Sequence, residues 1–245
     1  MIKISGLIAL GFIVSMTAVG YAGQKASPAA KADRFETTSI KAVRPNLVKT
    51  LTALQKKDVK AARAAFEAYD SAWNGVEVYI NTRSTDLYAA IEQKLQAKIT
   101  EGLKAPSPDF PTLVSDTQAM IAKYDEAISL VEKATPLNPL YDDVARLRIV
   151  RSHLREVNPA LKAGEVDKAR KSFDAFNENW DSIEDLVKQR SSDAYVAIES
   201  GMIQIERAFM PKQPDSNEIT TLVSGVMDKY NAIVTQVTRE ARAAK

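Results

Sequence analysis

Two stretches of this sequence follow the same pattern of polar and aromatic residues. WNGVEVYINTRSTDLYAAIE runs from Trp73 to Glu92, and WDSIEDLVKQRSSDAYVAIE runs from Trp180 to Glu199. At a constant offset of 107 positions, residues 53–92 align without a gap with residues 160–199, and roughly sixteen of the forty pairs are identical. The period is too long for a short solenoid repeat. It predicts an internal duplication of two up-down helical bundles of about a hundred residues each.

The rest of the chain also has the composition of helices. Glycine is scarce, at 9 of 245 residues, and apolar side chains recur with helical spacing. Prolines cluster near residues 106–111, 136–139 and 211–214, where we expect loops. We therefore predict an all-α fold of two tandem four-helix units, 39–135 and 136–245. The expected helices are 40–55, 58–82, 84–104, 112–133, 141–163, 165–189, 191–209 and 216–243, with Asp58 and Ser84 as N-caps.

The N-terminus has the pattern of a secretory signal peptide. Lys3 precedes an apolar stretch, and small residues end it at Ala22, so we expect residues 1–22 to be removed. Residues 23–38 are predicted to form a flexible leader. A retained membrane anchor is the alternative, although the apolar stretch is short for a bilayer span. These features predict a secreted or periplasmic location, or a lumenal one in a photosynthetic bacterium, with no membrane span after cleavage.

Composition excludes several classes of protein. The chain has no cysteine, which rules out disulfides, CxxCH haem attachment and thiol catalysis. A net charge of +2 with mixed signs does not favour a nucleic-acid partner. No Gly-rich phosphate loop predicts a nucleotide, and no HExxH or Ser/His/Asp spacing predicts catalysis. With one histidine, His153, we predict that the protein is not an enzyme.

The repeated residues meet across a predicted helical hairpin. Trp73 and Glu77 share a face at i,i+4, and so do Tyr88 and Glu92 on the next helix. The turn at Arg83 places both glutamates about 10–12 Å from it, at 1.5 Å per residue. The second copy repeats this arrangement with its matching residues, namely Trp180, Glu184, Arg190, Tyr195 and Glu199.

Two facing carboxylates need a cation, an arginine or a shared proton between them. Carboxylate and tyrosine oxygens suit hard cations such as Fe(III), Ca or Mn, so the glutamates of both copies are candidate metal ligands. The alternative is an internal polar network, in which the glutamates accept hydrogen bonds and the aromatic residues belong to the core. In that network Arg83 and Arg190 would hold their turns through Asp86 and Asp193.

The doubled pattern ARxxFxxYxxxWxxVExxIxxRSxDLYxxIE, from Ala62 to Glu92, resembles the extracytoplasmic helical domain associated with bacterial high-affinity, oxidase-dependent iron permeases. The resemblance implies a protein of iron handling whose partner is a membrane iron permease or another envelope protein. The chain lacks the REXXE motif of the permease itself. His153 and Glu156 match half of the GxHxxE signature of imelysin-like proteins, with Arg151 in place of its glycine.

Two other functions compete with metal binding. The chain could be a non-catalytic scaffold or sensor-like module that binds a protein partner, in which case the repeat only builds the hairpin. A small organic ligand held between Trp73 and Tyr88 is the third hypothesis.

Overall fold

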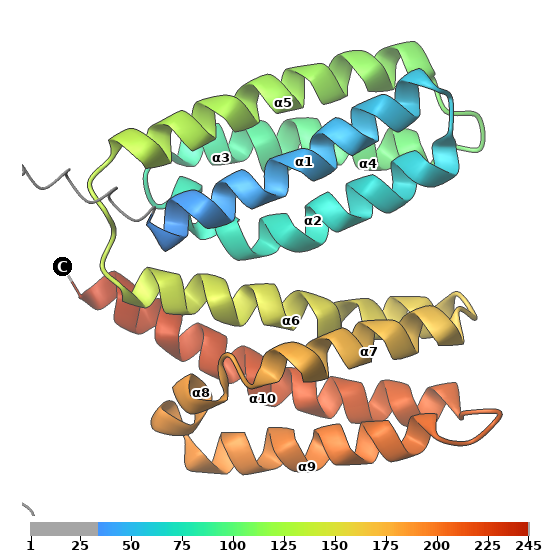
Figure 1. The fold of residues 1–245 in the computed structure, drawn as a ribbon, viewed down its shortest axis with the longest axis vertical. Coiled ribbons are helices and arrows are strands. Elements are labelled where there is room, and N and C mark those ends of the chain that lie inside the picture. Colours follow the sequence, from blue (N-terminus) through green and yellow to red (C-terminus); the bar gives the residue numbers. More distant parts are fainter. Residues whose placement is uncertain (1–33, 245) are drawn as a thin grey trace, which may run out of the picture. The chain divides into compact units, whose positions relative to one another are not determined.

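The computed structural model describes residues 34–244, and within that range the chain forms helices and no strand. The all-α prediction is therefore confirmed (Figure 1). The predicted signal peptide and residues 23–33 of the predicted leader lie outside the described residues. Residues 35–38, which we assigned to the leader, already belong to the first helix. Glu36 accounts for this earlier start, because it is buried and forms ion pairs with Arg34 and Arg83.

The helices form two groups along the chain. The first bundle consists of α1 (Phe35–Gln55), α2 (Val59–Asn81), α3 (Thr85–Ala89), the π-helical segment η1 (Ala90–Gln96), α4 (Ala97–Lys104) and α5 (Phe110–Lys133). The second bundle consists of α6 (Leu140–Lys162), α7 (Val166–Trp180), α8 (Glu184–Arg190), α9 (Ser192–Phe209) and α10 (Ser216–Ala243). The prolines at 106–108, 136–139 and 211–214 lie between helices, as the sequence predicts, whereas Pro111 belongs to the first turn of α5.

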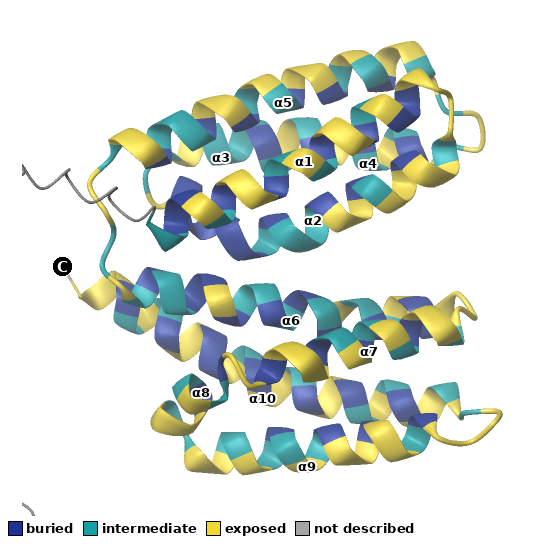
Figure 2. Cartoon of the chain, in the orientation of Figure 1, coloured by how far each residue is buried: buried dark blue, intermediate teal, exposed yellow. Residues whose placement is uncertain are grey.

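The buried apolar residues of the two bundles form one continuous core, and the bundles meet mainly through α2 and α6. In the first bundle α1 packs against α2 and α5, and α5 also packs against η1 and α4. In the second, α6 packs against α7 and α10, and α10 packs against α9. Buried residues line the inward faces of these helices, while the outer faces are exposed (Figure 2). Contact between α2 and α6 connects the bundles.

Gly75 permits the close approach of α2 to α6. A Cβ atom at this position would lie only 2.3 Å from Cγ1 of Ile149 on α6. No side chain fits in that space unless Ile149 moves, so the absence of a side chain at Gly75 sets the distance between the two helices.

The predicted helix starts are confirmed at both caps. The Asp58 carboxylate accepts a hydrogen bond from the Ala61 N–H at 2.9 Å, and the Ser84 hydroxyl accepts one from the Leu87 N–H at 3.2 Å. These bonds satisfy backbone donors that a helix start leaves without partners. Together with the short turns before them, they fix where α2 and α3 begin.

The single helix predicted over residues 165–189 is wrong. It is broken after Trp180, and α8 begins only at Glu184. At the break the Ser182 hydroxyl donates to the Asn179 carbonyl at 2.6 Å, and the Ile183 N–H donates to the Trp180 carbonyl at 2.9 Å. Side-chain bonds of this kind compete with the helical ladder. Glu184 is therefore the first residue of α8, and it does not lie one turn after Trp180 on the same helix.

The helix predicted over 84–104 continues through that range, but it contains the π-helical segment η1. Buried Ile91 matches buried Ile198 at an offset of 107 positions, whereas beyond η1 buried Ile99 matches buried Ile205 at 106. The first half thus has one extra residue here, and the wider π-helical turn accommodates it. Such segments are frequent at functional sites.

Candidate functional site

In the first bundle the repeated residues form one connected cluster. Trp73 is buried on α2, and its indole N–H donates a hydrogen bond to Oε2 of Glu92 on η1. The Tyr88 ring stacks on Trp73, with centroids 6.3 Å apart and an interplanar angle of 12°. Burial raises the pKa of Glu92, an effect that the bond from Trp73 opposes and the charge of Asp70 reinforces. Glu92 is thus a carboxylate held in place but poorly solvated.

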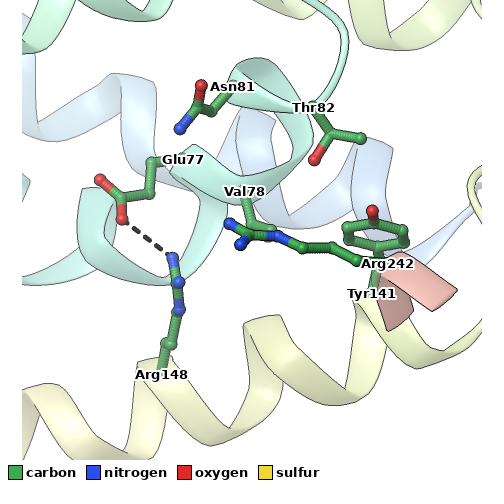
Figure 3. Close-up of a pocket in the computed structure, with 7 residues that line it drawn as sticks. All are labelled: Glu77, Val78, Asn81, Thr82, Tyr141, Arg148 and Arg242. Atoms are coloured by element: carbon green, nitrogen blue, oxygen red, sulfur yellow. Dashed lines mark hydrogen bonds and ion pairs between the residues drawn. The ribbon is translucent and has the colours of Figure 1, made fainter. Parts of the chain in front are cut away.

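Glu77 has an arginine as its counter-charge. Arg148 of α6 donates to Oε1 of Glu77 at 2.9 Å across the contact between the bundles (Figure 3). Burial nevertheless raises the pKa of Glu77, with Arg148 opposing the shift and the nearby charge of Glu92 adding to it. The pair borders a cavity of about 310 Å³, lined by Glu77, Val78, Asn81, Thr82, Tyr141, Arg148 and Arg242.

The second bundle contains the same contacts around its tryptophan. The Trp180 indole N–H donates to Oε1 of Glu199, and the Tyr195 ring stacks on Trp180 at 6.3 Å and 18°. The Tyr195 hydroxyl donates to Oε2 of Glu184 at 3.4 Å. Despite the broken helix, Glu184 still reaches the tyrosine of the cluster.

The two clusters differ in their counter-charges. Within the described residues neither Glu184 nor Glu199 forms an ion pair with a lysine or an arginine, in contrast to Glu77. A cationic group does lie beside this cluster, since Nζ of Lys188 is 5.2 Å from the centroid of the Tyr195 ring. The second bundle therefore holds two carboxylates, one bonded to Trp180 and one to Tyr195, without an arginine paired to either.

The predicted partners of Arg83 and Arg190 are wrong. Arg83 forms an ion pair with Glu36 of α1 at 2.7 Å, not with Asp86. Arg190 likewise contacts more distant carboxylates instead of Asp193: Asp143 at 3.6 Å and Glu240 at 3.4 Å. Both arginines reach across to another helix because the buried or half-buried acids there need a counter-charge. These ion pairs tie the turn of each hairpin to a neighbouring helix, and the two arginines do not contact the clusters.

Three polar residues near Glu92 were missed by sequence reasoning. Gln96 is 7% exposed, and its Nε2 donates to Oδ1 of Asp70 at 2.5 Å. Tyr69 is fully buried and stacks on Trp73 at 6.0 Å. The Gln96 Oε1 and Tyr69 Oη atoms have no hydrogen-bond partner within the described chain. The repeat does not single out these residues, because they differ between the two halves of the chain.

The described helices set limits on metal binding and membrane insertion. Over residues 34–244 no three His, Cys, Asp or Glu side chains lie close enough together to hold an ion as a group. A cation at either cluster would therefore depend on two carboxylates at most, supplemented by neutral oxygens and water. Nor does that range contain a helix with both the length and the apolarity to cross a bilayer.

Comparisons with protein-family models, curated proteins and solved structures give no match to this chain. The resemblance to the iron-permease domain therefore rests on the repeated residues alone.

Proposed function

We propose that this chain is an extracytoplasmic, non-catalytic helical protein that binds a hard cation, iron foremost, at its carboxylate–aromatic clusters. The observation that carries the proposal is the cluster in the second bundle. Tyr195 donates to Glu184 and interacts electrostatically with both Glu184 and Glu199, and no lysine or arginine forms an ion pair with either carboxylate in the described chain. A hard cation supplies the missing positive charge and accepts carboxylate and phenol oxygens as ligands.

The physiological role within this proposal follows from the resemblance of the repeat. A cation-binding protein outside the cytoplasm suits an accessory of a membrane iron permease, or of another envelope protein that handles metals. In this role the cation is cargo, so moderate affinity and an accessible site are advantages. The carboxylates of both clusters are partly exposed, which agrees with such a role.

The test is a metal screen on the chelator-stripped protein. Melting temperature is followed with Fe(III), Fe(II), Cu(II), Zn(II), Mn(II) and Ca(II), beside a variant in which four glutamates are changed to glutamine: Glu77, Glu92, Glu184 and Glu199. Because a ligand that binds only the folded state raises its stability, a hard cation should raise the melting temperature of the parent and not of the variant. A matched control carries Glu178→Gln and Glu206→Gln, two exposed positions outside the clusters. Equal shifts in all three proteins, or none with any metal, would contradict the proposal.

One observation favours the second candidate function, a module that binds a protein partner. Val196, Ile203 and Met210 are 56%, 47% and 69% exposed, and they recur every seven residues along α9 and its C-cap. Such spacing places them on one face of the helix, where exposed apolar side chains are typical of a docking surface. If this is the function, changing all three to serine abolishes co-purification of an envelope partner, while the four glutamine substitutions only lower the melting temperature.

A further inference from the structure

The two bundles share the Trp–Glu–Tyr cluster, but they differ in the side chains beside it. Tyr69 and Asp70 correspond to Phe176 and Asn177 at an offset of 107 positions. Gln96 lies beyond the extra residue in η1, and its counterpart is Met202, which is buried to a similar extent and likewise precedes a core isoleucine by three residues. The second bundle thus builds the same packing with Phe, Asn and Met.

This difference shows that packing alone does not require the polar set of the first bundle. Burying a polar oxygen without a partner costs about 1–3 kcal/mol, and Gln96 Oε1 and Tyr69 Oη are two such atoms. A buried methionine and phenylalanine avoid that cost in the second bundle. A ligand for these oxygens explains why the first bundle carries them.

Gln96 and Asp70 of this set are hydrogen-bonded, and all four side chains carry oxygens of the kind that hard cations take as ligands. Gln96 Nε2 donates to the Asp70 carboxylate, and the other arm of the same amide, Oε1, has no hydrogen-bond partner within the described chain. The charge of Asp70 helps to raise the pKa of Glu92, and the charges of both carboxylates help to raise the pKa of Tyr69. The set contains two carboxylates and two neutral oxygens, consistent with the absence of any three-carboxylate group in residues 34–244.

The set is open to solvent along one side. Glu92 and Gln96 border a surface hollow of about 460 Å³ together with Ala97, Thr100, Glu101 and Lys104. Asp70 borders an adjoining hollow of about 340 Å³ that shares Thr100 and Lys104. An ion can therefore enter with part of its water shell. Two positive groups, Lys104 and Arg155, act on Asp70 and set a limit on affinity, since an incoming cation must compete with them.

We propose that Asp70, Glu92 and Gln96, with Tyr69 adjoining, form a site in the first bundle for a divalent hard cation of the Ca²⁺ or Mn²⁺ class. The Asp70 and Glu92 carboxylates and the Gln96 amide oxygen are its protein ligands, and water completes the coordination. This inference rests on the proposed function and narrows it, because it assigns to the first bundle ligands other than Glu77, which Arg148 already neutralises.

The test uses Trp73 as the reporter, since its indole donates to the proposed ligand Glu92. The chain has two tryptophans, so Trp180→Phe leaves Trp73 as the single emitter. In this background, the triple variant Tyr69→Phe, Asp70→Asn and Gln96→Met gives the first bundle the residues of the second. It keeps all four repeated glutamates and should keep the fold. Circular dichroism and thermal melting verify the folded state.

Titration of the chelator-stripped protein with CaCl₂ and MnCl₂ should change Trp73 emission, and the triple variant should weaken the apparent affinity by at least about tenfold, the scale on which supporting groups alter metal sites. A second variant, Glu184→Gln with Glu199→Gln, should leave the emission change intact. The inference is overturned if the triple variant responds like its parent. If equilibrium dialysis of the chain with Trp180 intact shows that cations bind, and only the Glu184 and Glu199 changes abolish that binding, the proposed function stands and this site does not. If no cation binds to any form, both fail.

Discussion

Trp73 and Glu92 are joined by a hydrogen bond from the indole N–H to the carboxylate, and Trp180 and Glu199 are joined by the same bond in the second bundle. Both indoles are buried, at 1% and 2% exposure. A buried donor that loses its acceptor keeps the cost of desolvation without the gain of the bond. The glutamates therefore matter to folding whether or not they also bind a cation.

The first prediction separates these two roles. Glu92→Ala leaves the indole of Trp73 without an acceptor and should lower the free energy of unfolding by about 1–3 kcal/mol. Glu92→Gln keeps a carbonyl acceptor and should cost less than about half of that. Urea unfolding of both variants, and of the matched Glu199 variants, measures the difference. Equal losses for alanine and glutamine would show that the bond to the indole contributes little.

A second prediction concerns the contact between α2 and α6. Gly75→Ala places a methyl group within 2.3 Å of Ile149 Cγ1 and should cost about 1–3 kcal/mol through overpacking. Ile149→Ala removes the obstructing atoms, so the double variant should recover part of the loss in a double-mutant cycle. Gly225→Ala is a suitable control, because a Cβ atom there meets nothing within 4 Å. Additive effects at Gly75 and Ile149 would contradict the close contact.

The turns before α2 and α7 supply a third prediction. Lys57 has φ 57° and Gly164, its counterpart 107 positions later, has φ 76°. A side chain in this left-handed region costs about 1–2 kcal/mol, which glycine avoids. Lys57→Gly should therefore raise the melting temperature, and Gly164→Ala should lower it. The essential result is that the two substitutions change the melting temperature in opposite directions. Thermal melts at one scan rate measure both changes.

A fourth prediction follows from the carboxyls of the first bundle. Burial raises the pKa values of Asp70, Glu77 and Glu92 above their ordinary values of 3.8, 4.5 and 4.5. A raised pKa means that the folded state retains protons that the unfolded state has lost, so these groups favour folding below the ordinary values and lose that contribution as pH rises through the raised ones. Changing Asp70 to asparagine and Glu77 and Glu92 to glutamine should reduce the loss of stability between about pH 4 and the raised pKa values. The urea unfolding midpoints of the parent and the variant, measured across that pH range, test this prediction.

Cation binding should show the reverse dependence on pH. The ligand oxygens must be ionised, so apparent affinity is expected to fall as acidification protonates Asp70 and Glu92. Cation titrations at several pH values test this prediction. An affinity that stays constant over the pH range in which Asp70 and Glu92 become protonated would exclude these two carboxyls as ligands.

The fold was largely predictable because helical periodicity, proline clusters and capping residues act locally. Asp58 and Ser84 cap their helices as expected, since an N-cap needs only its own next turn. The break after Trp180 was not predictable from periodicity, because it depends on a competition between the Ser182 side chain and the helix backbone. The partners of Arg83 were missed for a different reason: Glu36 lies 47 positions away in the sequence, and only tertiary packing brings it near.

The candidate site was predicted in part. Periodicity placed Trp73 next to Glu92 across the hairpin, and the hydrogen bond between them bears this out. It could not show that Arg148 neutralises Glu77, because α6 belongs to the other half of the chain. The repeat of identical residues does not point to Asp70 and Gln96, because the two halves of the chain differ at these positions. A comparison of buried positions that are polar in one copy and apolar in the other would have found Gln96 and Met202.

The most direct test of cation binding is a count of bound ions. Equilibrium dialysis of the chelator-stripped chain against Mn²⁺ measures stoichiometry in the parent, in the Tyr69→Phe, Asp70→Asn, Gln96→Met variant, and in the Glu184→Gln, Glu199→Gln variant. We predict that the parent binds the ion at both clusters, that each variant loses one of the two sites, and that the two variants combined bind none. Equal binding by all four proteins, or no binding by the parent to Mn²⁺, Ca²⁺ or Fe(III), would contradict the assignment of these clusters as cation sites.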